Sequence, residues 1–125
     1  MADVTRAAQQ AGRQFESNVI ELAHVLGWYV AAFRPAKTKH GWRTAVAADG
    51  RGWPDLTLVH PGLQLVLFRE LKSGTGRPTM EQLAWGRRLT EAGADWAVWR
   101  PYMLQTVILA ELRGEQSNLL SGRLG

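Results

Sequence analysis

Two acidic residues and a lysine lie close together in the middle of the sequence, at a spacing that suits phosphodiester chemistry. Asp55 ends the run Gly52-Trp53-Pro54-Asp55, and fifteen residues later the chain reads Glu70-Leu71-Lys72. Two carboxylates can hold a hard divalent cation such as Mg²⁺ or Mn²⁺, which prefers oxygen ligands and keeps several waters. A lysine beside them can orient a water molecule on that cation. The motif therefore indicates hydrolysis of phosphodiester bonds.

The carboxylates need a hairpin to bring them together. Residues 55–60 and 65–72 are rich in apolar residues and are predicted to be strands, and Pro61-Gly62 between them is a strong turn signal. With a hairpin loop of two or four residues, His60 is expected to face Leu63 and Asp55 to face Phe68. Side chains alternate along a strand, so Asp55 would lie diagonal to Glu70 on the same face, with α-carbons roughly 7–8 Å apart. A shift by one residue would break the site.

A second helix is predicted to begin at Thr79-Met80-Glu81-Gln82. The pattern is that of a capping box, in which Gln82 reaches back to the backbone of Thr79. Gln82 could instead support the carboxylate site, and the sequence leaves both roles open. The charged end of the strand 65–72 favours a real site, because charges that end a buried strand need partners or a metal.

These motifs together resemble the PD-(D/E)XK nuclease superfamily, and more narrowly its VRR-NUC group of stand-alone, phage-type members. The resemblance rests on Gly52-Trp53-Pro54-Asp55, Glu70-Leu71-Lys72 and Gln82-x-x-Trp85, and it extends from the first helix to Val98-Trp99-Arg100-Pro101. It implies a metal-dependent DNA nuclease in which Asp55 and Glu70 are metal ligands, Lys72 is the catalytic lysine and Gln82 supports the site.

The same resemblance implies a carboxylate on the first helix, at a position where this chain has Gly12. The predicted helix 4–26 has one apolar stripe, and at about 100° per residue Glu16 lies at the edge of that stripe. Glu16 is therefore the candidate for a third metal ligand. The alternative is that Glu16 is an ordinary surface glutamate.

The remaining elements predict a single mixed α/β domain. The expected order is α-β-β-β-α-β-α, a restriction-endonuclease-like core with helices on both sides of a small mixed sheet. The domain is expected to span residues 1–113 of the 125, with a C-terminal tail at 114–125. An apolar content of 46% is typical of a folded domain. The absence of cysteine excludes disulfides and thiolate zinc sites.

The net charge of +4 is concentrated in one segment, residues 34–51, which has five basic residues and one acidic residue. The rest of the chain has ten basic and ten acidic residues. Such a segment can neutralise DNA phosphates, although a solubilising loop is the alternative. The candidate DNA-binding residues are Arg34, Lys37, Lys39, Arg43 and Arg51, with Trp42 as a flat face for unpaired bases.

The sequence thus predicts a Mg²⁺- or Mn²⁺-dependent DNA endonuclease. Branched DNA such as a Holliday junction is the expected substrate, because small members of the resembled family resemble junction resolvases. Such an enzyme would act as a homodimer with one site for each cut strand. A flap or single-strand nuclease with the same site and a non-catalytic DNA-binding module are the alternatives. No stretch approaches membrane-spanning length, and the cytoplasm of a bacterial or phage-infected cell is the expected location.

Overall fold

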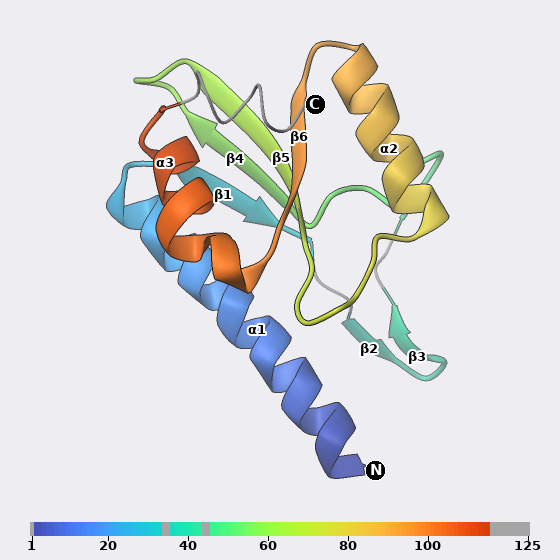
Figure 1. Ribbon diagram of the computed structural model, residues 1–125. Helices are drawn as coiled ribbons and strands as arrows, with labels where there is room; N and C mark the ends of the chain where they lie inside the picture. Colours follow the sequence, from blue (N-terminus) through green and yellow to red (C-terminus); the bar gives the residue numbers. More distant parts are fainter. Residues whose placement is uncertain (1, 34–35, 44–45, 116–125) are drawn as a thin grey trace.

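A four-stranded mixed sheet forms the centre of the computed structural model, which describes residues 2–33, 36–43 and 46–115 (Figure 1). The strand order is β1-β4-β5-β6, with antiparallel pairing of β1 to β4 and of β4 to β5, and parallel pairing of β5 to β6. The strands are β1 (Tyr29–Ala32), β4 (Leu56–His60), β5 (Leu65–Leu71) and β6 (Asp95–Trp99). Because β5 and β6 are parallel, the chain crosses over between them, and it does so through a helix.

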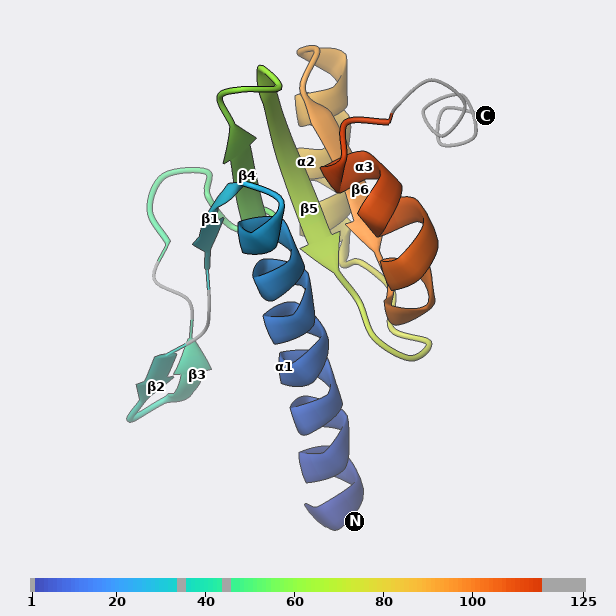
Figure 2. The ribbon, with the colours of Figure 1, turned by 90° about the vertical axis from the view of Figure 1, so that its left-hand side faces the viewer.

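One face of the sheet is covered by α1 (Ala2–Val25) and by the C-terminal helical segment (Figures 1 and 2). Phe15, Val19 and Ala23 recur every four residues along α1 and are buried, as expected of an amphipathic helix. The last helix of the expected order, which the sequence places at residues 103–112, is not one regular helix. It consists of a 3₁₀ turn, η1 (Pro101–Met103), a π-helical turn, η2 (Leu104–Ile108), and the short α3 (Leu109–Leu112).

The opposite face is covered by α2 (Met80–Glu91), which packs against β5 and β6 (Figure 1). Gly86 is buried at the middle of this helix, and an added Cβ there would lie 2.6 Å from the ring of Trp96. Real side chains do not approach so closely, so the missing side chain lets α2 lie directly on the Trp96 ring.

The predicted hairpin forms, but its register differs by two residues from the prediction. His60 pairs with Leu65 rather than Leu63, because the loop contains four residues, 61–64, and Gln64 takes a left-handed conformation with φ of 57°. A loop of two or four residues was expected, and the loop has the longer of these lengths. Since the difference is an even number of residues, every side chain keeps its face. Continuing the register by one pair places Asp55 opposite Glu70, not Phe68.

A second, two-stranded sheet lies apart from the first, between β1 and β4 in the chain (Figure 2). It is formed by β2 (Ala36–Thr38) and β3 (Gly41–Arg43), within the segment that was expected to be a loop. The predicted α/β class and the helices on both sides of a mixed sheet are confirmed, with this hairpin added. Among the described residues, no helix is both long and apolar enough to cross a membrane.

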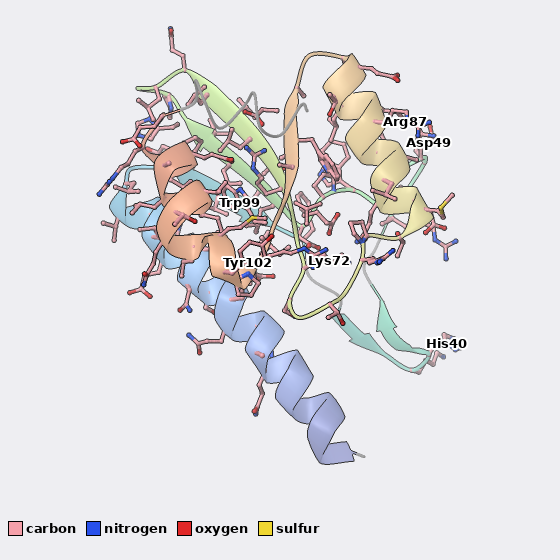
Figure 3. The ribbon with its side chains drawn as sticks, viewed as in Figure 1. His40, Asp49, Lys72, Arg87, Trp99 and Tyr102 are labelled. Carbon is pink, nitrogen blue, oxygen red and sulfur yellow. The ribbon has the colours of Figure 1, made fainter. Side chains whose placement is uncertain are left out.

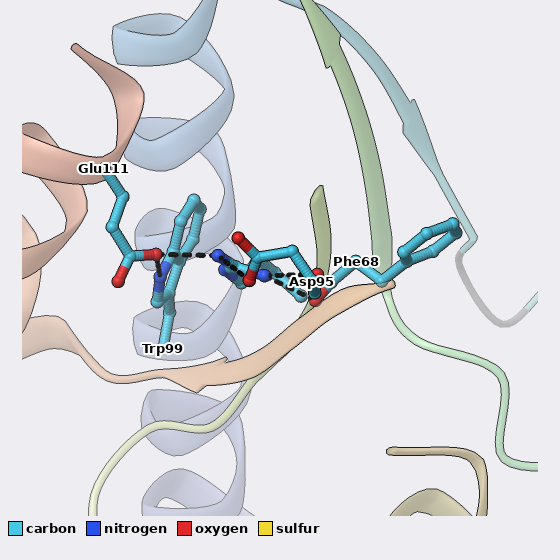
Figure 4. Close-up of polar contacts among 5 residues, drawn as sticks. Phe68, Asp95, Trp99 and Glu111 are labelled. Atoms are coloured by element: carbon cyan, nitrogen blue, oxygen red, sulfur yellow. Dashed lines mark hydrogen bonds and ion pairs between the residues drawn. The ribbon is translucent and has the colours of Figure 1, made fainter. Parts of the chain in front are cut away.

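A buried ion cluster ties β5, β6 and α3 together on the face that α1 covers (Figure 4). Arg69 is fully buried and donates hydrogen bonds to the backbone oxygen of Asp95 (2.7 Å), to the Asp95 carboxylate (2.9 Å) and to Glu111 Oε1 (2.8 Å). Trp99 Nε1 donates to the same Glu111 oxygen, and the Arg69 guanidinium lies 5.1 Å from the Trp99 ring centre. The sequence analysis did not identify this cluster, because its members are far apart in the chain.

Candidate active site

Asp55, Glu70 and Lys72 meet at one edge of the sheet, where β4 begins and β5 ends. Asp55 directly precedes β4, and its Oδ2 atom accepts a hydrogen bond from the backbone N–H of Leu71 (2.8 Å). Glu70 is the next-to-last residue of β5 and is fully buried. Lys72 follows the end of β5, where Figure 3 places it beside the loop that leads to α2. Its backbone N–H donates to Trp99 O (3.1 Å), which holds the lysine alongside β6.

The environment of Glu70 disfavours its ionised form. Burial of the side chain, its hydrogen-bonding contact with Asp55 and the negative charge of Asp55 together raise the pKa of Glu70 to about 9, whereas Lys72 acts in the opposite direction. Glu70 Oε2 is buried and has no hydrogen-bond donor among the described residues. Two ionised carboxylates repel each other at this position, and a proton or a cation shared with Asp55 would relieve that repulsion.

This arrangement fits a hard divalent cation. Two carboxylates in contact, one with a buried oxygen that lacks a donor, form the oxygen-rich and negatively charged pair that Mg²⁺ and Mn²⁺ prefer. Among residues 2–33, 36–43 and 46–115, no three His, Cys, Asp or Glu side chains form a cluster that could hold a metal. Glu16 is half-buried on α1, and it does not form such a cluster with Asp55 and Glu70.

Gln82 has both of the roles that the sequence left open. Its side-chain oxygen accepts from the Thr79 N–H (2.8 Å) and its own N–H donates to Thr79 Oγ1 (3.2 Å), which completes the capping box of α2. Its Nε2 atom donates to Glu70 Oε1 (3.0 Å). One side chain therefore begins the helix and orients the buried carboxylate.

The loop that carries Asp55 is held against α2 by contacts that the sequence analysis missed. Trp85 Nε1 donates to Asp49 O (2.9 Å), and the Trp53 ring makes edge-to-face contacts with Trp85 (5.0 Å) and Phe68 (5.6 Å). Gly52 has a φ of 88°, and an added Cβ would lie 2.5 Å from the backbone of Glu81. The glycine in Gly-Trp-Pro-Asp was a usable signal, because such close backbone approaches require it.

The predicted DNA-binding residues are described only in part. Lys39 is exposed in the turn between β2 and β3, and the Arg51 side chain is 80% exposed with its Nε 3.9 Å from Glu81. Lys37 lies in β2, and Trp42 and Arg43 lie in β3, but the positions of these three side chains are not described. Arg34 lies outside the described residues.

A solved structure entitled "VRR_NUC domain" is similar to this chain, with a TM-score of 0.58 and 22% sequence identity. The alignment covers 78% of this chain and 92% of that chain. No protein-family model and no curated protein matches the sequence. At this identity the likeness shows the fold, which the sequence motifs had predicted. The chain has the fold of a VRR_NUC domain.

Proposed function

We propose that this protein is a metal-dependent nuclease of the PD-(D/E)XK type that hydrolyses phosphodiester bonds in DNA. The observation that carries the proposal is the contact between Asp55 and Glu70 at the same sheet edge as Lys72. The fold of a VRR_NUC domain and the concentrated positive charge of residues 34–51 support it. A non-catalytic DNA-binding module is less well supported, because the two carboxylates and the lysine are all present.

Asp55 and Glu70 would hold Mg²⁺ or Mn²⁺, and the bound cation would supply Lewis-acid activation of water and neutralisation of charge on the phosphate. The Gln82 amide keeps one oxygen of Glu70 oriented, and the Leu71 N–H does the same for Asp55 Oδ2. The Lys72 ammonium offsets the negative charge that develops on the phosphate oxygens in the transition state. Arg34, Lys37, Lys39, Arg43 and Arg51, together with Trp42, would bind the DNA strand.

The proposed substrate is branched DNA, with a flap or a single-stranded tail as the alternative. The pair of Asp55 and Glu70 would form one site and make one cut, whereas symmetric cleavage of a four-way junction requires two cuts. Junction resolution would therefore need a homodimer, with an interface of roughly 1,200 Å² or more. Light scattering of the free and junction-bound protein tests whether it is a homodimer. A monomer in both states would refute junction resolution and would be consistent with a nuclease that nicks one strand.

The decisive experiment incubates the purified protein with labelled duplex, flap and four-way junction DNA in Mg²⁺, in Mn²⁺ and in EDTA. We expect cleavage with the cations and none in EDTA. Asp55→Asn and Glu70→Gln should abolish cleavage but retain DNA binding, because each removes one negative charge and almost no volume. Glu91→Gln is the matched control, since Glu91 is exposed at the far end of α2 from Gln82. Cleavage by Glu70→Gln at the wild-type rate would refute the assignment.

A further inference from the structure

Phe33 lies in the same row of the sheet as the two carboxylates. Its backbone N–H donates to Asp55 O (3.0 Å), which extends the pairing of β1 with β4 by one residue beyond Ala32 and Leu56. Asp55 in turn lies opposite Glu70 when the β4–β5 register is continued. Paired residues share a face, so Phe33, Asp55 and Glu70 form one row across three adjacent strands, each roughly 5 Å from the next.

The ring of Phe33 is exposed at this position. Its exposed fraction is 46%, and β1 is an edge strand, so no other strand among the described residues pairs with its outer side. By contrast, the Trp53 ring is packed against both Phe68 and Trp85. A half-exposed phenylalanine beside Asp55 forgoes part of the stabilisation that full burial of its ring would give. An occupant that covers the ring would recover some of it.

The charge that follows Phe33 indicates the occupant. The chain leaves this residue directly into the basic segment 34–51, which suits a polyanion. A phosphate held at Asp55 and Glu70 through a cation would bring the attached nucleotides within reach of the neighbouring ring. Bases in duplex DNA are already stacked on each other, whereas an unpaired base has a free face for an aromatic side chain. The ligand class that fits is an unpaired nucleotide next to the scissile phosphate.

We propose that Phe33 is a stacking platform for an unpaired nucleobase adjacent to the phosphate held at Asp55 and Glu70. This inference rests on the proposed nuclease function and deepens it, because it makes unpaired DNA a determinant of substrate choice. Tyr29 supplies a matched control. It lies on the same strand and the same face and is 70% exposed, but it is four residues away, about 13 Å along the strand. If DNA bound to a nonspecific apolar surface, its affinity would depend on both residues. If a base stacks on Phe33, the affinity depends on Phe33 alone.

The test compares Phe33→Leu, Phe33→Tyr and Tyr29→Leu in single-turnover cleavage of a splayed DNA with a single-stranded tail. Leucine retains apolar volume but lacks an aromatic face, and tyrosine restores the face. We expect Phe33→Leu to raise the half-saturating protein concentration roughly tenfold, within the range that base stacking gives. Phe33→Tyr and Tyr29→Leu should behave like the wild type. Equal effects of Phe33→Leu and Tyr29→Leu would overturn the proposal.

An abasic scan identifies the stacked base. Single abasic nucleotides are placed at each position within two nucleotides of the mapped cut. At one position the wild type should lose about the same factor as Phe33→Leu loses on intact DNA, and Phe33→Leu should lose nothing further. Losses that multiply at every position would mean that no base stacks on Phe33.

Stacking can also be measured without cleavage. In the Glu70→Gln background, splayed DNAs with 2-aminopurine at successive positions of the single-stranded tail and the branch should show, at one position, fluorescence quenching that Phe33→Leu removes. If the wild type cuts no DNA but this quenching is present, the proposed nuclease function fails and the stacking site stands. If the wild type cuts and the quenching is independent of Phe33, the stacking site fails and the nuclease function stands.

Discussion

Glu70 shows how much of the chemistry resides in one residue. It is fully buried, contacts Asp55 and accepts a hydrogen bond from Gln82, yet its second oxygen has no donor among the described residues. A buried carboxylate in this state destabilises the fold unless it is protonated or bound to a cation. Glu70 is therefore suited to binding a cation, but its ionised form lowers the stability of the metal-free protein.

The first prediction concerns the stability of the metal-free protein. The pKa of Glu70 is about 9 in the folded protein and 4.5 as its ordinary value, so the unfolded chain releases a proton that the folded chain keeps. The contribution of Glu70 to stability is thus fully present below pH 4.5 and is lost as the pH rises towards 9. In EDTA, Glu70→Gln should melt at a higher temperature than the wild type at pH 8.5, with a smaller difference at pH 5.5.

Thermal melting with Mg²⁺ completes this test. The wild type should gain stability from the cation, and more at pH 8.5 than at pH 5.5, because binding must displace the proton. Glu70→Gln should gain little at either pH, and Glu91→Gln should behave like the wild type. A wild type and a Glu70→Gln variant with the same pH dependence in EDTA would contradict the raised pKa of Glu70.

The second prediction separates the two roles of Gln82. Thr79→Ala removes the threonine half of the capping box and should cost about 1 kcal/mol of stability, with cleavage retained. Gln82→Glu keeps an acceptor for the Thr79 N–H but cannot donate to Glu70 when ionised. It should retain stability and lose at least about tenfold in cleavage rate, the effect of one lost hydrogen bond to a charged group. Cleavage that falls only in proportion to melting temperature in both variants would make Gln82 a cap alone.

Among the elements, α2 supplies the back of the site. It contributes Gln82 to Glu70, holds the Asp55 loop through Trp85 and lies on Trp96 through Gly86. The helix was predicted from its capping box and apolar spacing, and those local signals determine where it begins and ends. The distance between α2 and the sheet depends on the contact of Gly86 with Trp96, and these two residues belong to different elements.

The third prediction tests how closely α2 must approach the sheet. Gly86→Ala adds a methyl group 2.6 Å from the Trp96 ring, so α2 must move away from the sheet. Overpacking of this kind costs typically about 1–3 kcal/mol, partly offset by a gain of up to about 1 kcal/mol in helix propensity. The cleavage rate should fall by more than the loss of folded protein explains, because the shift carries Gln82 away from Glu70. Arg87→Ala, on an exposed position of the same helix, is the control, measured by urea unfolding and cleavage rate.

The hairpin shows what the sequence can and cannot predict at this scale. The alternation of apolar residues determined which face each side chain takes, and it correctly placed Asp55 and Glu70 on one face. The pairing of His60 with Leu63 was wrong, because the loop has four residues and ends in a left-handed Gln64, which is not a residue type that marks such a turn. The β2–β3 hairpin was missed because its strands are three residues long and lack an apolar pattern. Short-range patterns predict faces, and tertiary contacts determine register and depth.

Across the whole molecule, the cluster of Arg69, Asp95 and Glu111 lies behind the site, on the other face of the same strand. Arg69 directly precedes Glu70. Trp99 donates a hydrogen bond from its ring to Glu111, and its backbone oxygen accepts a hydrogen bond from the backbone N–H of Lys72. The cluster therefore joins β5, β6 and α3 at the residues that position the catalytic edge. The sequence reveals Arg69 only as one charge in an apolar strand.

The fourth prediction follows from the burial of this cluster. Arg69→Met leaves Glu111 buried without its partner, which typically costs about 3–5 kcal/mol. The double variant Arg69→Met/Glu111→Leu removes both charges and should recover a large part of that loss. Urea unfolding of the two variants and of Glu111→Leu completes the cycle. Losses that simply add would show that the two residues do not stabilise each other.

The last prediction concerns the asymmetric charge of the molecule, in which the excess of basic residues lies in residues 34–51. Changing Lys37, Lys39 and Arg43 together to alanine should weaken DNA binding and flatten its salt dependence by about 0.7–0.9 of a unit of log–log slope for each phosphate that the variant no longer binds. Arg87, Arg88 and Arg113, which are exposed on other elements, form the control triple with the same reduction of charge. The control should retain the wild-type slope, because a lower total charge leaves the phosphate-binding side chains of residues 34–51 in place.

Cleavage at saturating DNA should change little in both triples, since neither alters Asp55 or Glu70. Binding is measured over a series of salt concentrations, and equal slopes for the two triples would mean that residues 34–51 only make the protein soluble.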